Sequence, residues 1–205
     1  MPSFREAAAL LCDLGRACQG RGWVQGTSGN FSAVTSREPL RLAITPSGGD
    51  KGSLAEGEIL EIDAEARVVS GRGRPSAEAV LHLALARARG AGAVAHTHSV
   101  WSTLLSEAHA GEGGLSIAGY EMLKGLAGVT THAHREWLPI VENTQDWPTA
   151  SGAVEEMLRR EPEAHAFLIR RHGLYTWGRD VPEARRHLEV LEFLLEVTGR
   201  QAWRS

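Results

Sequence analysis

Apolar residues recur along this chain with two spacings, one typical of helices and one of short strands. From Ser3 to about Gln19 they return every three or four positions, which predicts an amphipathic helix. Ser3 and Glu6 at its start have the spacing of a capping box. The same helical spacing predicts further helices over about 77–89, 100–107 and 149–160, and from about 181 onward.

Short apolar runs between these segments predict strands over 31–34, 40–45, 93–98, 137–141 and 166–170, and a hairpin over 58–63 and 67–70. Residues 108–114 indicate a glycine-containing loop, and residues 116–125 fit neither period. Strands outnumber helices and several are consecutive, which favours a mixed or antiparallel sheet with helices packed on it. No repeat or linker divides the chain, so we expect a single domain over residues 1–205.

The composition excludes several classes of function. The net charge is −3, which predicts no broad basic surface for nucleic acid or anionic membrane. No apolar run approaches the ~20 residues of a membrane span, and the first residues lack the pattern of a signal peptide. Cys12 and Cys18 point to different parts of the predicted first helix, so we expect no disulfide and a reducing, cytoplasmic location.

Two of the nine histidines, His96 and His98, lie in a predicted strand at positions i and i+2. Such residues point to the same face, so both imidazoles can reach one metal ion. His172 ends another predicted strand and precedes a glycine, which makes it a candidate third ligand. Three nitrogen ligands with an open position are typical of catalytic zinc, although His-x-His also occurs in strands without any metal.

The other histidines are weaker candidates. His132 and His134 form a second His-x-His, but their polar neighbours indicate a loop or an outer site. The remaining four are expected at the surface or in helix packing: His82, His109, His165 and His187.

Three segments rich in serine, threonine and glycine can expose backbone N–H groups to an anion, phosphate above all. They are residues 26–30, residues 45–52 with Lys51, and the turn at Ser76, where a helix N-terminus follows. The candidate phosphate-binding residues are Thr27, Ser28, Gly29, Asn30, Ser47, Gly48, Lys51 and Ser76. Glu78 lies in the first turn of that helix. Its negative charge either interacts favourably with the helix dipole or faces the ligand.

Only two lysines occur in the chain, Lys51 and Lys124. Lys124 lies three residues after Glu121, so on a helical turn the two side chains would be neighbours. From spacing alone, an exposed ion pair is the simplest interpretation.

Together these motifs resemble the class II (zinc) aldolase family, and they come in family order over nearly the whole chain. The residues that carry the resemblance are Gly26–Asn30, Thr45–Gly48, Pro75–Glu78, His96–His98 and Arg171–Gly173. The resemblance implies a three-layer α/β/α sandwich with a largely antiparallel sheet, assembled as a homotetramer with sites near subunit interfaces. It also implies one Zn²⁺ per subunit on His96, His98 and His172, and a sugar-phosphate substrate held by the serine and glycine loops.

Within that family, residues 120–125, 140–144 and 169–178 look most like the methylthioribulose-1-phosphate dehydratases of methionine salvage. That branch implies a hydro-lyase whose acid/base residue matches Glu121, whereas the aldolases use the glutamate matching Glu78. We therefore expect Glu121 to carry the proton, Lys124 to hold Glu121 or the substrate, and Glu78 to lie beside the zinc.

Two other functions stay open on the sequence. A class II aldolase or 4-epimerase acting on another ketose phosphate would use the same residues. A non-enzymatic interaction protein with this fold would be expected to lack the histidines or the glutamate, and all are present here. A three-histidine site also accepts Co²⁺, Ni²⁺ or Fe²⁺.

Overall fold

The structure is a computed structural model that describes residues 1–202, in which a nine-stranded sheet forms the centre. The strands are β1 Asn30–Arg37, β2 Leu40–Ile44, β3 Leu60–Ile62, β4 Val68–Ser70, β5 Ala93–Thr97, β6 Gly114–Ala118, β7 Arg135–Val141, β8 Ala166–Ile169 and β9 Gly173–Gly178. Their order across the sheet is β4-β3-β2-β1-β5-β9-β8-β7-β6. All neighbouring pairs are antiparallel except β7 and β8, which confirms the largely antiparallel sheet.

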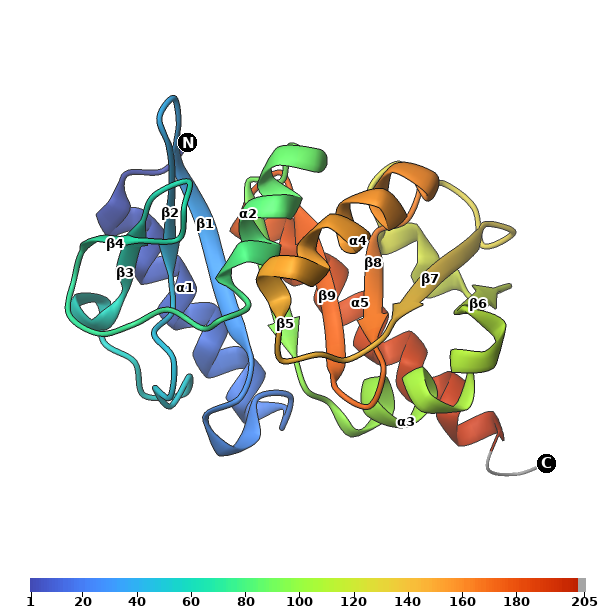
Figure 1. Cartoon of the computed structure of the whole chain (residues 1–205). Coiled ribbons are helices and arrows are strands. Elements are labelled where there is room, and N and C mark those ends of the chain that lie inside the picture. The colour runs from blue at the N-terminus through green and yellow to red at the C-terminus, as the bar shows by residue number, and fades with distance from the viewer. Residues whose placement is uncertain (203–205) are drawn as a thin grey trace.

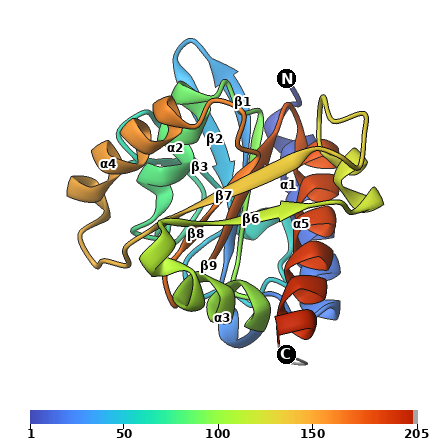
Figure 2. The same cartoon turned by 90° about the vertical axis from the view of Figure 1, so that its right-hand side faces the viewer.

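Helices cover both faces of this sheet (Figures 1 and 2). They are α1 Phe4–Gly20, α2 Ala79–Ala88, α3 Val100–Ala108, α4 Trp147–Arg160 and α5 Val181–Ala202. On one face α2 packs against α4, and on the other α1 packs against α5. The expected three-layer α/β/α sandwich is therefore confirmed.

The outer helices follow from their apolar stripes. The capping box of α1 is present, since Ser3 Oγ accepts from Glu6 N and the Glu6 carboxylate accepts from Ser3 N. Cys12 and Cys18 are both free and buried in the packed face of α1. The leucine stripe of α5, from Leu188 to Leu195, is fully buried against the sheet.

Two strands were not predicted, β6 and β9. β6 is an edge strand of mixed burial, and its first residue, Gly114, lies directly under the Trp137 indole, where a Cβ would come within 2.3 Å of the ring. β9 is buried along its whole length, so it lacks the polar–apolar alternation by which a half-exposed strand is recognised. A tight turn at Arg171, with φ +54°, joins it to β8.

Helix α2 begins at Ala79, two residues later than predicted. Ser76 does not cap it directly. Instead Ser76 Oγ accepts from Glu78 N at 3.2 Å in the preceding turn, which brings Glu78 to the helix start.

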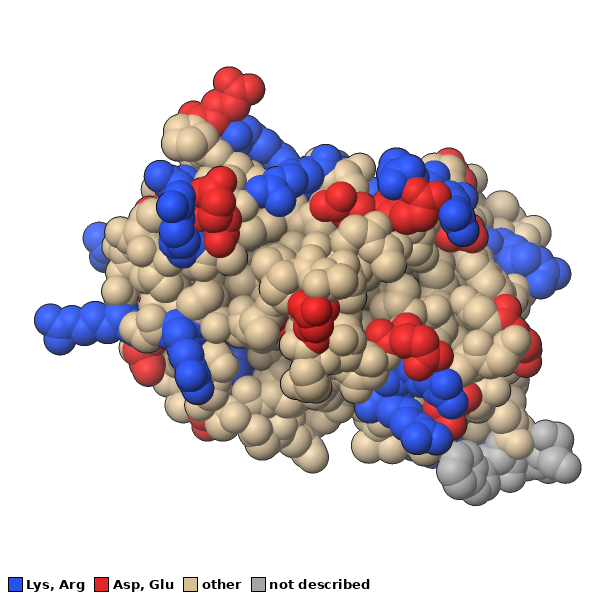
Figure 3. All heavy atoms as spheres, viewed as in Figure 1, with Lys and Arg blue, Asp and Glu red and all other residues tan. Residues whose placement is uncertain are grey.

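On the face shown in Figure 3, basic and acidic side chains are interspersed rather than gathered into one basic patch. Over the described residues, none of the helices is both long and apolar enough to span a membrane.

Candidate metal and substrate site

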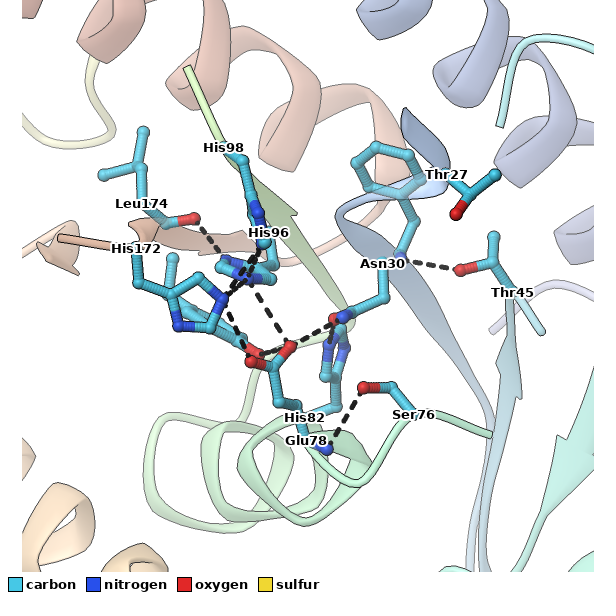
Figure 4. Close-up of polar contacts among 12 residues, drawn as sticks. Thr27, Asn30, Thr45, Ser76, Glu78, His82, His96, His98, His172 and Leu174 are labelled. Atoms are coloured by element: carbon cyan, nitrogen blue, oxygen red, sulfur yellow. Dashed lines mark hydrogen bonds and ion pairs between the residues drawn. The ribbon is translucent and has the colours of Figure 1, made fainter. Parts of the chain in front are cut away.

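His96, His98 and His172 converge on one point, and we call them the histidine centre (Figure 4). His96 lies in β5, His98 just after it, and His172 in the turn between β8 and β9. The Nε2 atoms of His96 and His98 are 2.8 Å apart. His172 Nε2 lies 3.3 Å from that of His96 and 3.0 Å from that of His98.

The pairing of β5 with β9 produces this convergence. His96 is paired with Tyr175, whose ring stacks on the imidazole at 4.0 Å between centroids. His96 Nδ1–H donates to the Leu174 carbonyl at 2.9 Å, which leaves Nε2 with its lone pair facing the centre. Gly173 allows the close approach of His172, because a Cβ at that position would lie 2.0 Å from the Thr97 carbonyl oxygen.

Burial keeps these imidazoles neutral. Burial, followed by the neighbouring histidines, lowers the pKa of His98 to about 4 and that of His96 well below its usual value. Burial also lowers the pKa of His172, although the Glu78 carboxylate acts in the opposite direction. Neutral imidazole is the form that binds a metal.

The geometry fits a divalent transition metal. Tetrahedral Zn²⁺ with ligand nitrogens at about 2.0–2.1 Å places neighbouring nitrogens roughly 3.3 Å apart, close to the separations of 2.8–3.3 Å in the centre. Three inward-facing lone pairs cannot all be satisfied by hydrogen bonds among themselves, whereas one cation satisfies them together. The arrangement leaves coordination positions open for a substrate.

Glu78 is the carboxylate beside the histidine centre, and it is only 7% exposed. Its Oε1 lies 3.2 Å from His172 Nε2, and its Oε2 lies 3.5 Å from His96 Nε2. Asn30 Nδ2 and Tyr175 OH donate to Oε2 at 2.8 and 3.2 Å, which leaves Oε1 directed at the histidines. Glu78 can therefore complete a metal site or act on a substrate bound there.

A buried chain of hydrogen bonds, which we call the relay, fixes the Asn30 side chain that donates to Glu78. Asn30 Oδ1 is hydrogen-bonded to His82 Nε2 (Figure 4). His82 Nδ1 is in turn bonded to Ser32 Oγ at 2.7 Å. His82 is fully buried rather than at the surface, and burial lowers its pKa to about 3. Sequence reasoning missed this role, and the available signal was the spacing of one helical turn between Glu78 and His82.

A cavity of about 290 Å³ opens beside His98 and His172. All eight candidate phosphate residues line it: Thr27, Ser28, Gly29, Asn30, Ser47, Gly48, Lys51 and Ser76. Segments 27–30 and 46–51, separated by two strands, thus meet in space. The structure does not bring Glu121 or Lys124 into this lining.

Two groups in this cavity suit an anion. Ser28 Oγ is buried and has no hydrogen-bond partner among the described residues. Lys51 is 1% exposed, and burial lowers its pKa. Its Nζ donates to the carbonyls of Thr27 and Gly49 at 3.0 and 2.6 Å, which leaves one of three N–H donors for a ligand.

Sequence reasoning missed Gln145 and Trp147, which also line the cavity. Trp147 begins α4, is 3% exposed, and has its ring centroid 6.2 Å from that of His172. Nothing in the local pattern of this segment shows that it folds over loops more than a hundred residues earlier.

Glu121 and Lys124 lie on a 3₁₀ turn, η4 Glu121–Gly125, which packs against α5. The predicted ion pair between them is present, and their side chains are 71% and 42% exposed. The hydrogen bond from Lys124 lowers the pKa of Glu121. Within one chain, the predicted proton carrier thus faces solvent, whereas Glu78 lies at the histidines.

Comparison with known proteins agrees with this geometry. The family model of the class II aldolase and adducin N-terminal domain matches residues 9–198. The chain belongs to this family. Its fold is also that of a solved L-fuculose 1-phosphate aldolase, with a TM-score of 0.79, 21% sequence identity, and coverage of 96% of this chain and 86% of that one.

Curated members of the family are more similar in sequence. The chain is 46% identical over 198 residues to the methylthioribulose-1-phosphate dehydratase of Methylococcus capsulatus, covering 96% of this chain and 95% of the relative. It is 44% identical over 196 residues to the protein of the same name from Sorangium cellulosum, covering 95% and 92%. The family resemblance inferred from the motifs is therefore confirmed.

Proposed function

We propose that this chain is a methylthioribulose-1-phosphate dehydratase. As a hydro-lyase of methionine salvage, it removes water from 5-methylthioribulose 1-phosphate and forms 2,3-diketo-5-methylthiopentyl 1-phosphate. The observation that carries this proposal is near-full-length identity of 39–46% to curated relatives of that name. The cavity supports it, because donors for an anion and the histidine centre lie in the same space.

We assign one Zn²⁺ per subunit to His96, His98 and His172. When bound, the metal polarises the substrate C2 carbonyl and so makes the C3 proton more acidic. The structure supports the assignment by the neutral imidazoles and the Nε2 separations, and Glu78 can occupy a further position until substrate arrives.

The serine and glycine loops hold the substrate phosphate in this proposal. Ser28 Oγ supplies a hydrogen bond that no protein group uses, and Lys51 supplies a charge-assisted one. Backbone N–H groups of the loops and the turn at Ser76 complete the site. With the phosphate fixed there, the C2–C4 part of the sugar extends toward the histidines.

Proton transfer is assigned to Glu121. Its carboxylate removes the C3 proton and then donates it to the C4 hydroxyl, which leaves as water. The electron pair of the C3–H bond becomes the C3–C4 double bond as the C4–O bond breaks. The resulting enol tautomerises to the 2,3-diketone, and Lys124 holds the Glu121 carboxylate in place.

Glu121 faces solvent and does not line the cavity of its own chain, so we propose that it acts at the histidine centre of a neighbouring copy. Exposed apolar side chains support such an assembly. They lie on α5 and on α3 and η4, which both contact α5: Val100, Leu104, Met122 and Phe193. This surface adjoins the site, because Thr103 Oγ1 on α3 donates to the His172 carbonyl at 3.2 Å. We propose a homotetramer in which Glu121 of one subunit faces the histidines of the next.

A second candidate is an aldolase or 4-epimerase acting on fuculose or ribulose phosphates. The position of Glu78 favours it, because Glu78 is the carboxylate that touches the histidine centre. The aldolase would break the C3–C4 bond and release an aldehyde, whereas the epimerase would break the same bond and re-form it on the other face. A non-enzymatic role on the same fold is disfavoured by the complete set of histidines and the orphaned Ser28 hydroxyl.

A substrate panel separates these functions. The purified, zinc-loaded protein is incubated with methylthioribulose 1-phosphate, fuculose 1-phosphate and ribulose 5-phosphate, and the products are read by mass spectrometry. We expect loss of one water from the first and no cleavage of the others. Aldehyde release or epimerisation would replace the dehydratase proposal with the second candidate. Absence of both metal binding and turnover would support the non-enzymatic role. The single domain and the cytoplasmic location stay predictions.

A further inference from the structure

A second group of metal-ligand residues lies away from the histidine centre: His134, Glu136 and His165, which we call the second cluster. Glu136 Oε2 lies 2.8 Å from His134 Nε2 and 3.0 Å from His165 Nδ1. Ligand atoms from all three residues lie within 4.8 Å of one another. Glu136 is only 1% exposed, so its carboxylate requires a cationic partner.

The second cluster is remote from the histidine centre. β8 and β9 pair so that Ala166 faces Thr176 and Ile169 faces Gly173. His165 precedes one end of β8, and His172 follows the other end. At ~3.3 Å per residue, the length of β8 alone separates them by about 13 Å.

The surroundings orient the second cluster in the way that proteins orient metal ligands. His165 Nε2–H donates to the Ala127 carbonyl at 2.8 Å, which directs its Nδ1 at Glu136. His96 in the histidine centre shows the same arrangement with its nitrogens exchanged. His165 N–H donates to Glu136 Oε1 at 2.9 Å, which turns Oε2 toward the imidazoles.

The Ala127 peptide that orients His165 is itself fixed by a further histidine. Ala127 N–H donates to His187 Nε2 at 3.0 Å, and His187 Nδ1–H donates to the Trp177 carbonyl at 2.7 Å. His187 therefore carries one proton and supports the neighbouring ligand rather than joining it. A cavity of about 470 Å³ lined by His134, His165 and His187 adjoins the cluster and gives an ion a path of entry.

We propose that His134, Glu136 and His165 form a second site for a divalent transition metal such as Zn²⁺ or Co²⁺. Two histidines and one glutamate with an open position are an established zinc ligand set. The ion links the turn before β7, the start of β7 and the residue before β8. β7 and β8 pair through Ile140–Leu168 and Val141–Ile169, near the other ends of both strands. The metal therefore fastens the ends that the strand pairing does not join, next to the hydrogen bond from His165 N–H to Glu136 Oε1.

Metal stoichiometry tests this site without any activity assay. The protein is stripped with a chelator, equilibrated with Zn²⁺, passed through a desalting column and measured for bound metal. We expect His134→Ala to bind one ion fewer per chain than wild type, and His132→Ala to bind the same number as wild type. His132 is the matched control, because it is an exposed histidine two residues away and outside the cluster. Equal binding by all three proteins overturns the proposal.

A second measurement isolates the site. His172→Ala removes a ligand of the histidine centre, and Co²⁺ is then added to this variant and to His172→Ala/His134→Ala. We expect visible Co²⁺ absorption and a raised Tm in the single variant, with at least a tenfold weaker Co²⁺ affinity in the double variant. If Co²⁺ changes neither protein, a proton on His165 compensates Glu136 and the site does not exist.

Discussion

The histidine centre and the turn that carries Glu121 differ in one respect. A single chain positions the residues of the first, whereas it leaves the second exposed to solvent. In the histidine centre His96 is fully buried and its Nδ1–H is held by the Leu174 carbonyl, and the buried Glu78 carboxylate is held by Asn30. The turn that carries Glu121 and Lys124 is exposed and ordered mainly by its own ion pair and its packing on α5.

The difference fits the two roles that we propose, metal binding for the buried centre and proton transfer for the exposed turn. A metal centre needs ligands placed to within a fraction of an ångström, and strand pairing inside one chain provides that placement. A proton carrier on an exposed turn can be completed by a neighbouring chain. The comparison also gives the two glutamates different tests, because Glu78 is positioned by its own chain whereas the proposed role of Glu121 requires the proposed assembly.

The largest expected effect comes from removing a ligand of the histidine centre. His172→Ala removes one of three nitrogen donors, so we expect the metal of this centre to be lost and turnover to fall by about a thousandfold or more. Metal analysis and the dehydration assay measure both. Full activity with metal retained at the centre would show that His172 is not a ligand.

Glu121→Gln is expected to lower kcat by roughly 10²–10⁴-fold, because it removes the proposed proton carrier, while the bound metal is unchanged. Mixing Glu121→Gln with His172→Ala subunits should restore part of the activity, since some mixed tetramers combine an intact Glu121 with an intact histidine centre. If mixing restores nothing, the assignment across subunits is wrong. If Glu78→Gln is the inactive variant and Glu121→Gln is active, Glu78 is the acid/base residue.

Ser28→Ala should raise KM about tenfold or more and leave kcat nearly unchanged, because a hydrogen bond to a charged phosphate is lost in the ground state and transition state alike. Steady-state kinetics measure the effect. The control is Ser70→Ala, which removes an exposed hydroxyl on β4. An unchanged KM in Ser28→Ala would remove Ser28 from the phosphate site.

The smallest effect concerns the relay behind Glu78. Because burial lowers the pKa of His82 from 6.5 to about 3, the unfolded chain binds one more proton than the folded chain between these values. The stabilising contribution is thus complete above pH 6.5 and is lost as the pH falls toward 3, by at most about 1.4 kcal/mol per pH unit. Urea unfolding of the chelator-treated protein should show a shallower pH dependence in His82→Gln than in wild type. Identical slopes would contradict the assignment.

Much of the fold was predictable from local pattern. The capping box of Ser3 and Glu6 marks the start of a helix, and the leucines of α5 recur with a helical period. The two predicted helices, α1 and α5, are both present. β9 was missed because a strand buried on both faces has no alternation to detect. β6 was missed because its short run follows glycines that indicate a loop.

The sequence by itself determined the chemistry that is available: His-x-His on a strand, a histidine before a glycine, and hydroxyl-rich loops with one lysine. Side-chain type and spacing of two residues are local properties, so they can be read without a fold. Only the tertiary structure decided which of these groups meet. Pairing of β5 with β9 brings His172 to His96, and the turn at Ser76 brings Glu78 to both. Contacts between residues that lie far apart in the sequence depend on strand order and packing, and no local pattern encodes them.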